Sequence, residues 1–189
     1  MIAKEELNIL WSLEQTAEKY EDRVAVSDVN QEMTWKGLVK KAQVIGAELS
    51  KKVQPGNPIP VLLEKSSETL AVMLGIVYAG CFYVPVNPMN PAERLRKIME
   101  KLEPEVIISD EKGKEQLAAV GVGLEEKVIG PETLLPTTGT DLSEEQRSKL
   151  EQIQGQWKET DALYGIFTSG STGTPKAIVV SHGAASRFI

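Results

Sequence analysis

The sequence has one cysteine, Cys81, and one histidine, His182. A single cysteine cannot form a disulfide within the chain, and the lack of clustered cysteines and histidines argues against a zinc or redox site. An excess of basic residues is also missing, because 21 Lys and Arg face 27 Asp and Glu, for a net charge of −6. The surface as a whole therefore favours neither nucleic acid nor an anionic membrane, and any anionic ligand must be bound locally.

Long apolar runs are absent as well. The most apolar stretch, residues 70–77, is far shorter than the roughly 20 residues that cross a bilayer, so it predicts a buried helix. The first residues, Met-Ile-Ala-Lys-Glu-Glu, lack the basic region and apolar run of a secretory signal. We therefore expect a cytoplasmic protein. A hydrophobic content of 41% over 189 residues is sufficient for the core of one large domain or two small ones.

Apolar periodicity predicts helices and strands in alternation along most of the chain. Helices are expected over residues 7–20, from the N-cap Thr34 to Leu49, from Ser66 or Ser67 to Tyr78, over 91–102 and 111–120, and after Ser181. Strands are expected over residues 24–27, 59–63, 81–86, 106–109, 163–167 and 177–180, with weaker support at Val128 and Ile129. This pattern predicts an α/β fold with a mostly parallel, doubly wound sheet and helices on both faces.

Between residues 131 and 158 the periodicity fades into prolines, threonines and charged residues, which predicts a surface excursion. The carboxylates in this stretch, around Glu144, are typical of a solvated face. Trp11, Trp35 and Trp157 are interpreted as packing residues rather than stacking platforms.

A Gly-rich segment lies between the last two predicted strands. Residues 168–176 read Thr-Ser-Gly-Ser-Thr-Gly-Thr-Pro-Lys. Glycines allow backbone N–H groups to approach anionic oxygens, hydroxyls add rotatable donors, and Lys176 supplies a compensating charge. The segment therefore predicts a phosphate-binding loop, although a cluster of Ser, Thr and Gly by itself is equally typical of a solvated turn.

The spacing in this segment excludes the commoner phosphate loop. Walker A requires Gly, four residues and then Gly-Lys-Ser/Thr. Gly165 and Gly170 have that separation, but Ser171 stands where lysine is needed. A P-loop NTPase is thus disfavoured, and the site has no GxGxxG dinucleotide fingerprint.

Residues 168–176 resemble the signature of the adenylate-forming (AMP-binding, ANL) superfamily, Thr-Ser-Gly-Ser-Thr-Gly-x-Pro-Lys, at every fixed position. Residues 78–88 are similar to the Lys-Ala-Gly-x-Ala-Tyr-Val-Pro-Ile-Asp-Pro segment of amino-acid adenylation domains, and 33–38 weakly match a Thr-Tyr-x-Glu-Leu element. The resemblance spans nearly the whole chain. It is closest to adenylation domains of nonribosomal peptide synthetases and to D-alanine to carrier protein ligases.

The resemblance implies ATP-dependent activation of a carboxylate, in particular of an amino acid, as an acyl-adenylate that is then transferred to a carrier thiol. The cofactors implied are ATP and Mg²⁺, with the metal ligand outside this chain. Lys176 and Thr172 are implied as catalytic residues. The residues implied to bind the phosphates are Thr168, Ser169, Gly170, Ser171, Thr172, Gly173 and Lys176.

The sequence departs from the family pattern at Asn87, Cys81 and Ala177, which replace an aspartate and two glycines. Ala177 could restrict the backbone beside the loop. His182 matches a histidine common after the motif, and a structural role is favoured over catalysis.

In the family, the residues that bind adenine, ribose, magnesium and the substrate side chain lie downstream of this motif. We therefore expect residues 1–189 to be an incomplete N-terminal subdomain with little ligase activity alone. Two other interpretations stay open: a fragment of an acyl-CoA synthetase, or a noncatalytic nucleotide-binding or interaction module.

Overall fold

The computed structural model describes residues 7–120, 123–135, 141–168 and 175–188. Its helices are α1 (Ile9–Lys19), α2 (Trp35–Leu49), α3 (Ser67–Tyr78), α4 (Ala92–Leu102), α5 (Glu111–Ala119), α6 (Glu144–Gly155) and α7 (His182–Ser186), with the short 3₁₀ turns η2 (Leu124–Lys127) and η3 (Pro131–Leu134). Its strands are β1 (Val24–Ser27), β2 (Glu32–Thr34), β3 (Pro58–Leu62), β4 (Phe82–Pro85), β5 (Ile107–Ser109), β6 (Val128–Ile129), β7 (Ala162–Thr168) and β8 (Lys176–Ser181).

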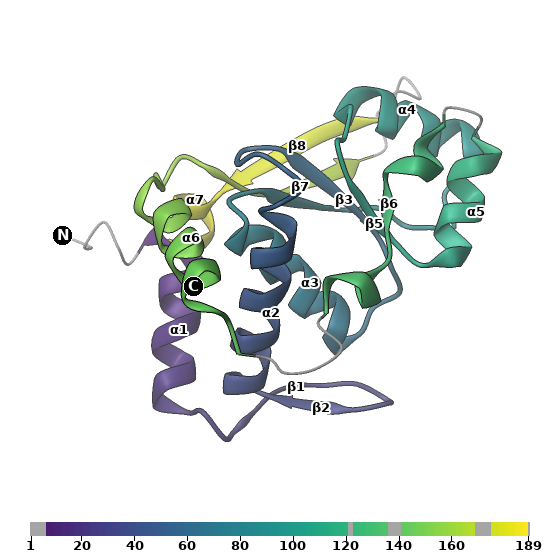
Figure 1. The fold of residues 1–189 in the computed structure, drawn as a ribbon. Helices are drawn as coiled ribbons and strands as arrows, with labels where there is room; N and C mark the ends of the chain where they lie inside the picture. Colours follow the sequence, from purple (N-terminus) through teal and green to yellow (C-terminus); the bar gives the residue numbers. More distant parts are fainter. Residues whose placement is uncertain (1–6, 121–122, 136–140, 169–174, 189) are drawn as a thin grey trace.

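Most strands form one sheet in the order β6-β5-β3-β4-β7-β8 (Figure 1). Neighbouring strands from β6 to β7 are parallel, and β8 alone runs antiparallel, beside β7. The chain starts the sheet at β3, adds β4 on one side and β5 and β6 on the other, and then returns to place β7 beside β4. The predicted mostly parallel sheet is confirmed. Strands β1 and β2 form a separate antiparallel pair.

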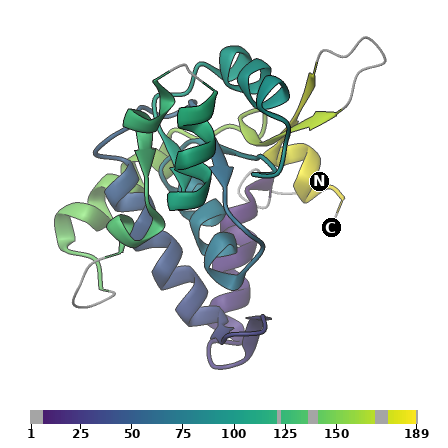
Figure 2. The same cartoon turned by 90° about the vertical axis from the view of Figure 1, so that its right-hand side faces the viewer.

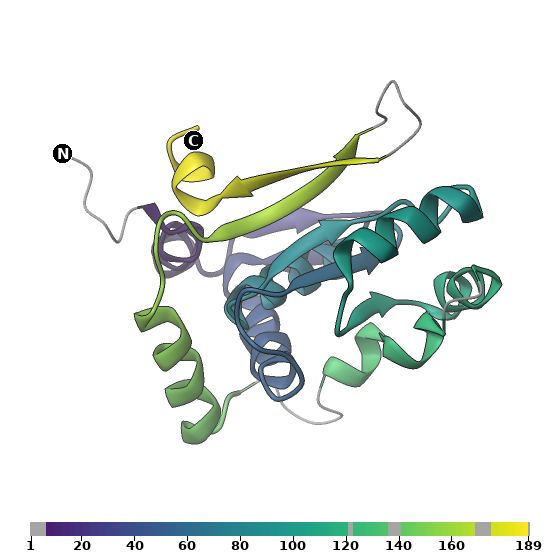
Figure 3. The same cartoon turned by 90° about the horizontal axis from the view of Figure 1, so that it is seen from above.

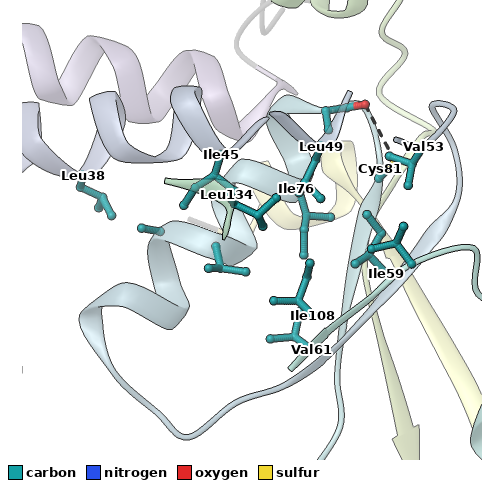
Figure 4. Close-up of a cluster of buried hydrophobic side chains, with 14 residues drawn as sticks. Leu38, Ile45, Leu49, Val53, Ile59, Val61, Ile76, Cys81, Ile108 and Leu134 are labelled. Atoms are coloured by element: carbon teal, nitrogen blue, oxygen red, sulfur yellow. Dashed lines mark hydrogen bonds between the residues drawn. The ribbon is translucent and has the colours of Figure 1, made fainter. Parts of the chain in front are cut away.

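Helices cover both faces of this sheet, as the sequence predicts. One hydrophobic cluster joins α2, α3 and η3 to β3 and β5, with Ile45, Ile76 and Ile108 fully buried (Figure 4). A second joins α4 and α5 to the opposite face through residues such as Leu95 and Leu117, and these two helices face the viewer in Figure 2. The main core thus has two layers, one on each side of the strands.

The predicted helix starts are confirmed by their caps. The side-chain oxygens of Thr34, Ser66 and Ser181 accept the backbone N–H groups of Gly37, Thr69 and Ala184. These bonds satisfy donors that have no partner within the helix. Ser66, and not Ser67, is therefore the cap of α3. No described helix is both long and apolar enough to span a membrane.

Helix α6 lies within residues 131–158, the stretch predicted as a surface excursion. Ser143 and Gln146 form a capping box at its start, and Leu150 and Ile153 are buried. Gln146 Nε2 also donates to Glu48 Oε1 of α2 at 2.9 Å. The apolar periodicity is weak here because two buried positions suffice to pack the helix, so the sequence did not predict it.

Helices α2 and α3 approach each other closely at two glycines. A Cβ added to Gly46 would lie 2.5 Å from Tyr78 Cβ and 2.9 Å from the carbonyl oxygen of Gly75. Neither neighbour is the end of a flexible side chain. The contact therefore disfavours any larger residue at Gly46, because the two helices would have to move apart to admit it.

Replacing Gly46 with alanine should destabilise the fold by about 1–3 kcal/mol, the usual cost of overpacking a core. The control is Gly155→Ala at the end of α6, where an added Cβ meets nothing within 4 Å. That change should be neutral or stabilising by up to about 1 kcal/mol, since alanine favours helix over glycine. Urea unfolding measures both, and equal midpoints for the two variants would contradict the close packing.

Candidate functional site

The two strands that flank the Gly-rich segment form an antiparallel hairpin at one edge of the sheet (Figure 3). Thr168, the last residue of β7, pairs with Lys176, the first residue of β8. Both side chains are exposed, whereas Pro175 is buried. Because β7 runs parallel to β3 and β4, Thr168 and Lys176 lie at the carboxyl edge of the parallel strands, where open α/β sheets bind their ligands.

The described residues include two members of the predicted phosphate-binding set. Thr168 and Lys176 are brought together as strand partners. The other five, Ser169, Gly170, Ser171, Thr172 and Gly173, lie outside the described residues, so their roles stay predictions. The structure therefore describes the two ends of the segment, which we call the base of the loop: the hydroxyl of Thr168 and the side chain of Lys176 lie on paired residues at the loop end of the hairpin.

Strand β7 is held firmly against β4. The rings of Tyr83 and Tyr164 stack with their centroids 5.7 Å apart, and these residues pair in the parallel register. At Gly165 an added Cβ would lie 3.3 Å from Val84 Cγ2, so a side chain there would crowd β4. The base of the loop is thereby fixed to the centre of the sheet.

Helix α4 also contacts the end of β7. Arg94, in the first turn of α4, donates from Nη2 to the backbone oxygen of Phe167 at 3.4 Å. The sequence analysis did not select Arg94. A cation in the first turn of a helix is unusual because it opposes the helix dipole, and this was the one signal in the sequence that could have indicated it.

The three departures from the family pattern are accommodated. Asn87 Oδ1 accepts the backbone N–H of Met89 at 2.9 Å, a turn contact that an aspartate could also make. Cys81 is buried, and its thiol donates to the carbonyl of Gln54 at 3.3 Å. Ala177 pairs with Phe167 within β8. Since Glu103 is the only described non-glycine residue with positive φ, the backbone at Ala177 does not require glycine.

His182 lies at the start of α7, at the end of the hairpin opposite the loop. Its side chain is fully buried, and neither ring nitrogen has a hydrogen-bond partner among the described residues. The ring packs edge-on against Trp157, 3.5 Å between centroids. Burial lowers the pKa of His182 to about 3, so the imidazole is neutral at physiological pH. Its packing in the core favours the structural role, as it does for Trp157.

Acidic residues do not gather into a metal site in the part of the chain described. No group of three or more His, Cys, Asp and Glu side chains is placed to hold an ion there. The described residues therefore offer one cation, Lys176, and one hydroxyl, Thr168, at the carboxyl edge, suited to an anionic ligand, without a set of metal ligands.

Comparison with known proteins identifies the family. The family model described as "AMP-binding enzyme" matches residues 13–189. The chain belongs to the AMP-binding enzyme family. Members of this family are adenylate-forming ligases, so the predicted resemblance of the chain to the adenylate-forming superfamily is confirmed.

Relatives of this AMP-binding chain include large bacterial peptide synthetases. Bacitracin synthase 1 of Bacillus licheniformis is 32% identical over 174 residues, 89% of this chain and 3% of that protein. Tyrocidine synthase 1 of Brevibacillus parabrevis is 31% identical over 170 residues, 89% of this chain and 15% of that protein. The chain therefore spans a small part of these relatives' length.

Solved structures share the fold of this AMP-binding chain. The Klebsiella oxytoca NpsA N-terminal subdomain in complex with 3-hydroxybenzoyl-AMSN aligns with a TM-score of 0.73 at 22% identity, over 93% of this chain and 41% of that chain. An AMPPNP-bound form of the nonribosomal peptide synthetase FmoA3 aligns with a TM-score of 0.76 at 23% identity, over 96% of this chain and 18% of that chain.

The buried imidazole predicts a pH-dependent stability. His182 binds a proton near pH 6.5 in the unfolded chain but only near pH 3 in the folded one, so its contribution is complete above pH 6.5 and is lost as the pH falls toward 3. In His182→Phe this contribution is absent. The unfolding free energy of wild type minus that of the variant should fall by about 2 kcal/mol from pH 7.5 to pH 5. Chemical denaturation at both pH values tests this, and a constant difference would show that the imidazole titrates normally.

Proposed function

We propose that this chain supplies the ATP phosphate-binding loop of an enzyme that activates an amino acid as an acyl-adenylate for transfer to a carrier thiol. The observation that carries the proposal is the pairing of Thr168 with Lys176. This pairing places both ends of the signature segment together at the carboxyl edge of the sheet, with the lysine exposed. Membership of the AMP-binding family and the similarity to peptide synthetases support it.

In the proposed reaction the substrate carboxylate attacks the α-phosphate of ATP, the bond to the β-phosphate breaks, and pyrophosphate leaves. The chain's task is to orient the triphosphate and neutralise its charge. Lys176 provides the positive charge, and the hydroxyls of Thr168, Ser169, Ser171 and Thr172 donate hydrogen bonds. Gly170 and Gly173 leave the backbone N–H groups open to the β- and γ-phosphates. Lys176 and Thr172 are the residues to which we assign the largest effects.

Magnesium would supply further charge neutralisation on the phosphates when it accompanies ATP. The described residues do not form a carboxylate cluster that fits such an ion. On the family resemblance, we propose that the protein ligand to magnesium comes from outside this chain.

The type of acceptor thiol is part of the proposal. The relatives named above are peptide synthetases, which favours a carrier protein over CoA and an amino acid over a fatty acid. An acyl-CoA synthetase is the alternative within the same family. We propose that the protein acts in the cytoplasm, without nucleic acid or membrane partners, and that residues 1–189 form an incomplete N-terminal subdomain.

Replacing Lys176 with alanine, or Thr172 with alanine, should weaken ATP binding by about 10- to 100-fold, because a hydrogen bond to a charged group contributes roughly 1.5–3 kcal/mol. Pyrophosphate exchange by the complete enzyme should fall with it. The control is Lys52→Ala, which removes an exposed lysine before β3, at the opposite edge of the sheet. Calorimetry and exchange assays measure both effects. Full exchange activity in the Lys176 variant would remove the assignment.

The isolated chain should bind ATP yet show little or no adenylate formation. The reason is that the loop holds the phosphates but the proposed adenine, ribose and metal contacts come from elsewhere in the complete enzyme. Pyrophosphate exchange by the purified 189-residue chain, with each of the proteinogenic amino acids, provides the measurement. Robust exchange would refute the proposal that the isolated chain lacks contacts needed for adenylate formation. If the extended protein also binds ATP without exchange, the noncatalytic module is the better assignment.

A further inference from the structure

The position of Arg94 follows from the order of the strands. Helix α4 begins at Ala92, just after β4 ends at Pro85, so its first turn lies at the carboxyl edge of the sheet. Strand β7 is the neighbour of β4. The first turn of α4 therefore stands beside the carboxyl end of β7, and Arg94 Nη2 reaches the backbone oxygen of Phe167.

The contact between Arg94 and Phe167 lies beyond the point at which β7 pairs with β4. Strands β4 and β7 pair at Tyr83 and Tyr164, and Phe167 lies beyond that point. Its ring packs partly buried against the cluster of α4 and α5, while its backbone pairs with Ala177 on the other side. Arg94 supplies a side-chain donor to the strand immediately before Thr168, the first residue of the signature segment.

Helix stability does not account for an arginine at this position. A cation in the first turn is disfavoured by the helix dipole, and α4 has no side-chain cap, since Pro91 stands at its N-cap. The acidic residue of that turn, Glu93, pairs instead with Arg96 and Lys97. Arg94 is half-buried, and its hydrogen bond goes to β7.

We propose that Arg94 is a positioning residue for the phosphate-binding loop. Its planar guanidinium holds the backbone carbonyl of Phe167, the residue immediately before Thr168, and so positions the end of β7 at which the signature segment begins. This inference rests on the proposed function, because it assigns to Arg94 an effect on triphosphate affinity.

The test compares three variants of the 189-residue chain by calorimetry with ATP. Arg94→Gln should weaken binding about 10-fold, because the end of β7 is then less well ordered in the free chain and ATP binding must order it. Arg94→Lys keeps the charge and one donor and should recover part of the affinity. The matched control, Arg96→Gln, removes the same charge from the same helix, where Arg96 bonds Glu93 and Glu100, and should leave binding unchanged within about twofold.

Hydrogen exchange gives an independent readout in the same samples. In Arg94→Gln the amides of Phe167 and Thr168, and those of β8 opposite them, should exchange faster, while amides of β3 and β5 keep their protection. Faster exchange in β3 and β5 as well would mean that Arg94→Gln unfolds. In that case the ATP affinity of Arg94→Lys is compared with that of wild type. Equal affinity of the two proteins would overturn the inference.

The outcomes separate the two proposals. If wild type binds no ATP, the proposed function fails and the inference fails with it. If wild type binds ATP and Arg94→Gln binds it equally well, the inference alone is overturned, even if exchange at β7 changes. Equal weakening in Arg94→Gln and Arg96→Gln would assign the effect to net charge and would also overturn it.

Discussion

The packing of β7 against β4 is the contact on which the candidate site depends. The chain visits the far side of the sheet through β5 and β6 before it returns, and the Tyr83–Tyr164 stack and the close approach at Gly165 hold β7 beside β4. This return places Thr168 at the carboxyl edge of the parallel strands. It also lets β8 close the hairpin, so that Lys176 stands beside Thr168. A different partner for β7 would separate Phe167 from Arg94 of α4.

Local structure could be predicted well because its causes are local. The Thr34 and Ser181 caps and the apolar faces of the helices can be recognised from a few neighbouring residues. Helix α6 could not, because its two buried residues have partners that are distant in the sequence: Leu150 packs in the cluster that includes Ala47 of α2, and Ile153 lies beside Gly80. Strand β2 was not predicted either, because Glu32–Thr34 has no apolar alternation and is defined by its pairing with β1. The order of strands in the sheet is non-local and was likewise beyond the sequence pattern.

The candidate site divides in the same way. The order of residues 168–176 predicts a phosphate-binding segment because it resembles the superfamily signature at every fixed position, all within one continuous stretch. The family match agrees with that interpretation. Arg94 could not be found in this manner, because its partner Phe167 is distant in the chain and near only after β7 returns to β4. His182, for which the sequence favours a structural role over catalysis, is a neutral ring packed against Trp157 in the structure.

The central claim is that ATP is bound by its phosphates at the mouth of the β7–β8 hairpin. An amide-resolved NMR titration of the ¹⁵N-labelled chain with ATP tests it most directly. The account predicts that the largest shift changes fall on Thr168, Lys176 and their strand neighbours, and that the resonances of buried residues behind the sheet, such as Ile45, stay in place. Shift changes centred on another face, such as the groove between α2 and α6 lined by Ser50 and Lys149, with Thr168 and Lys176 unmoved, would contradict it.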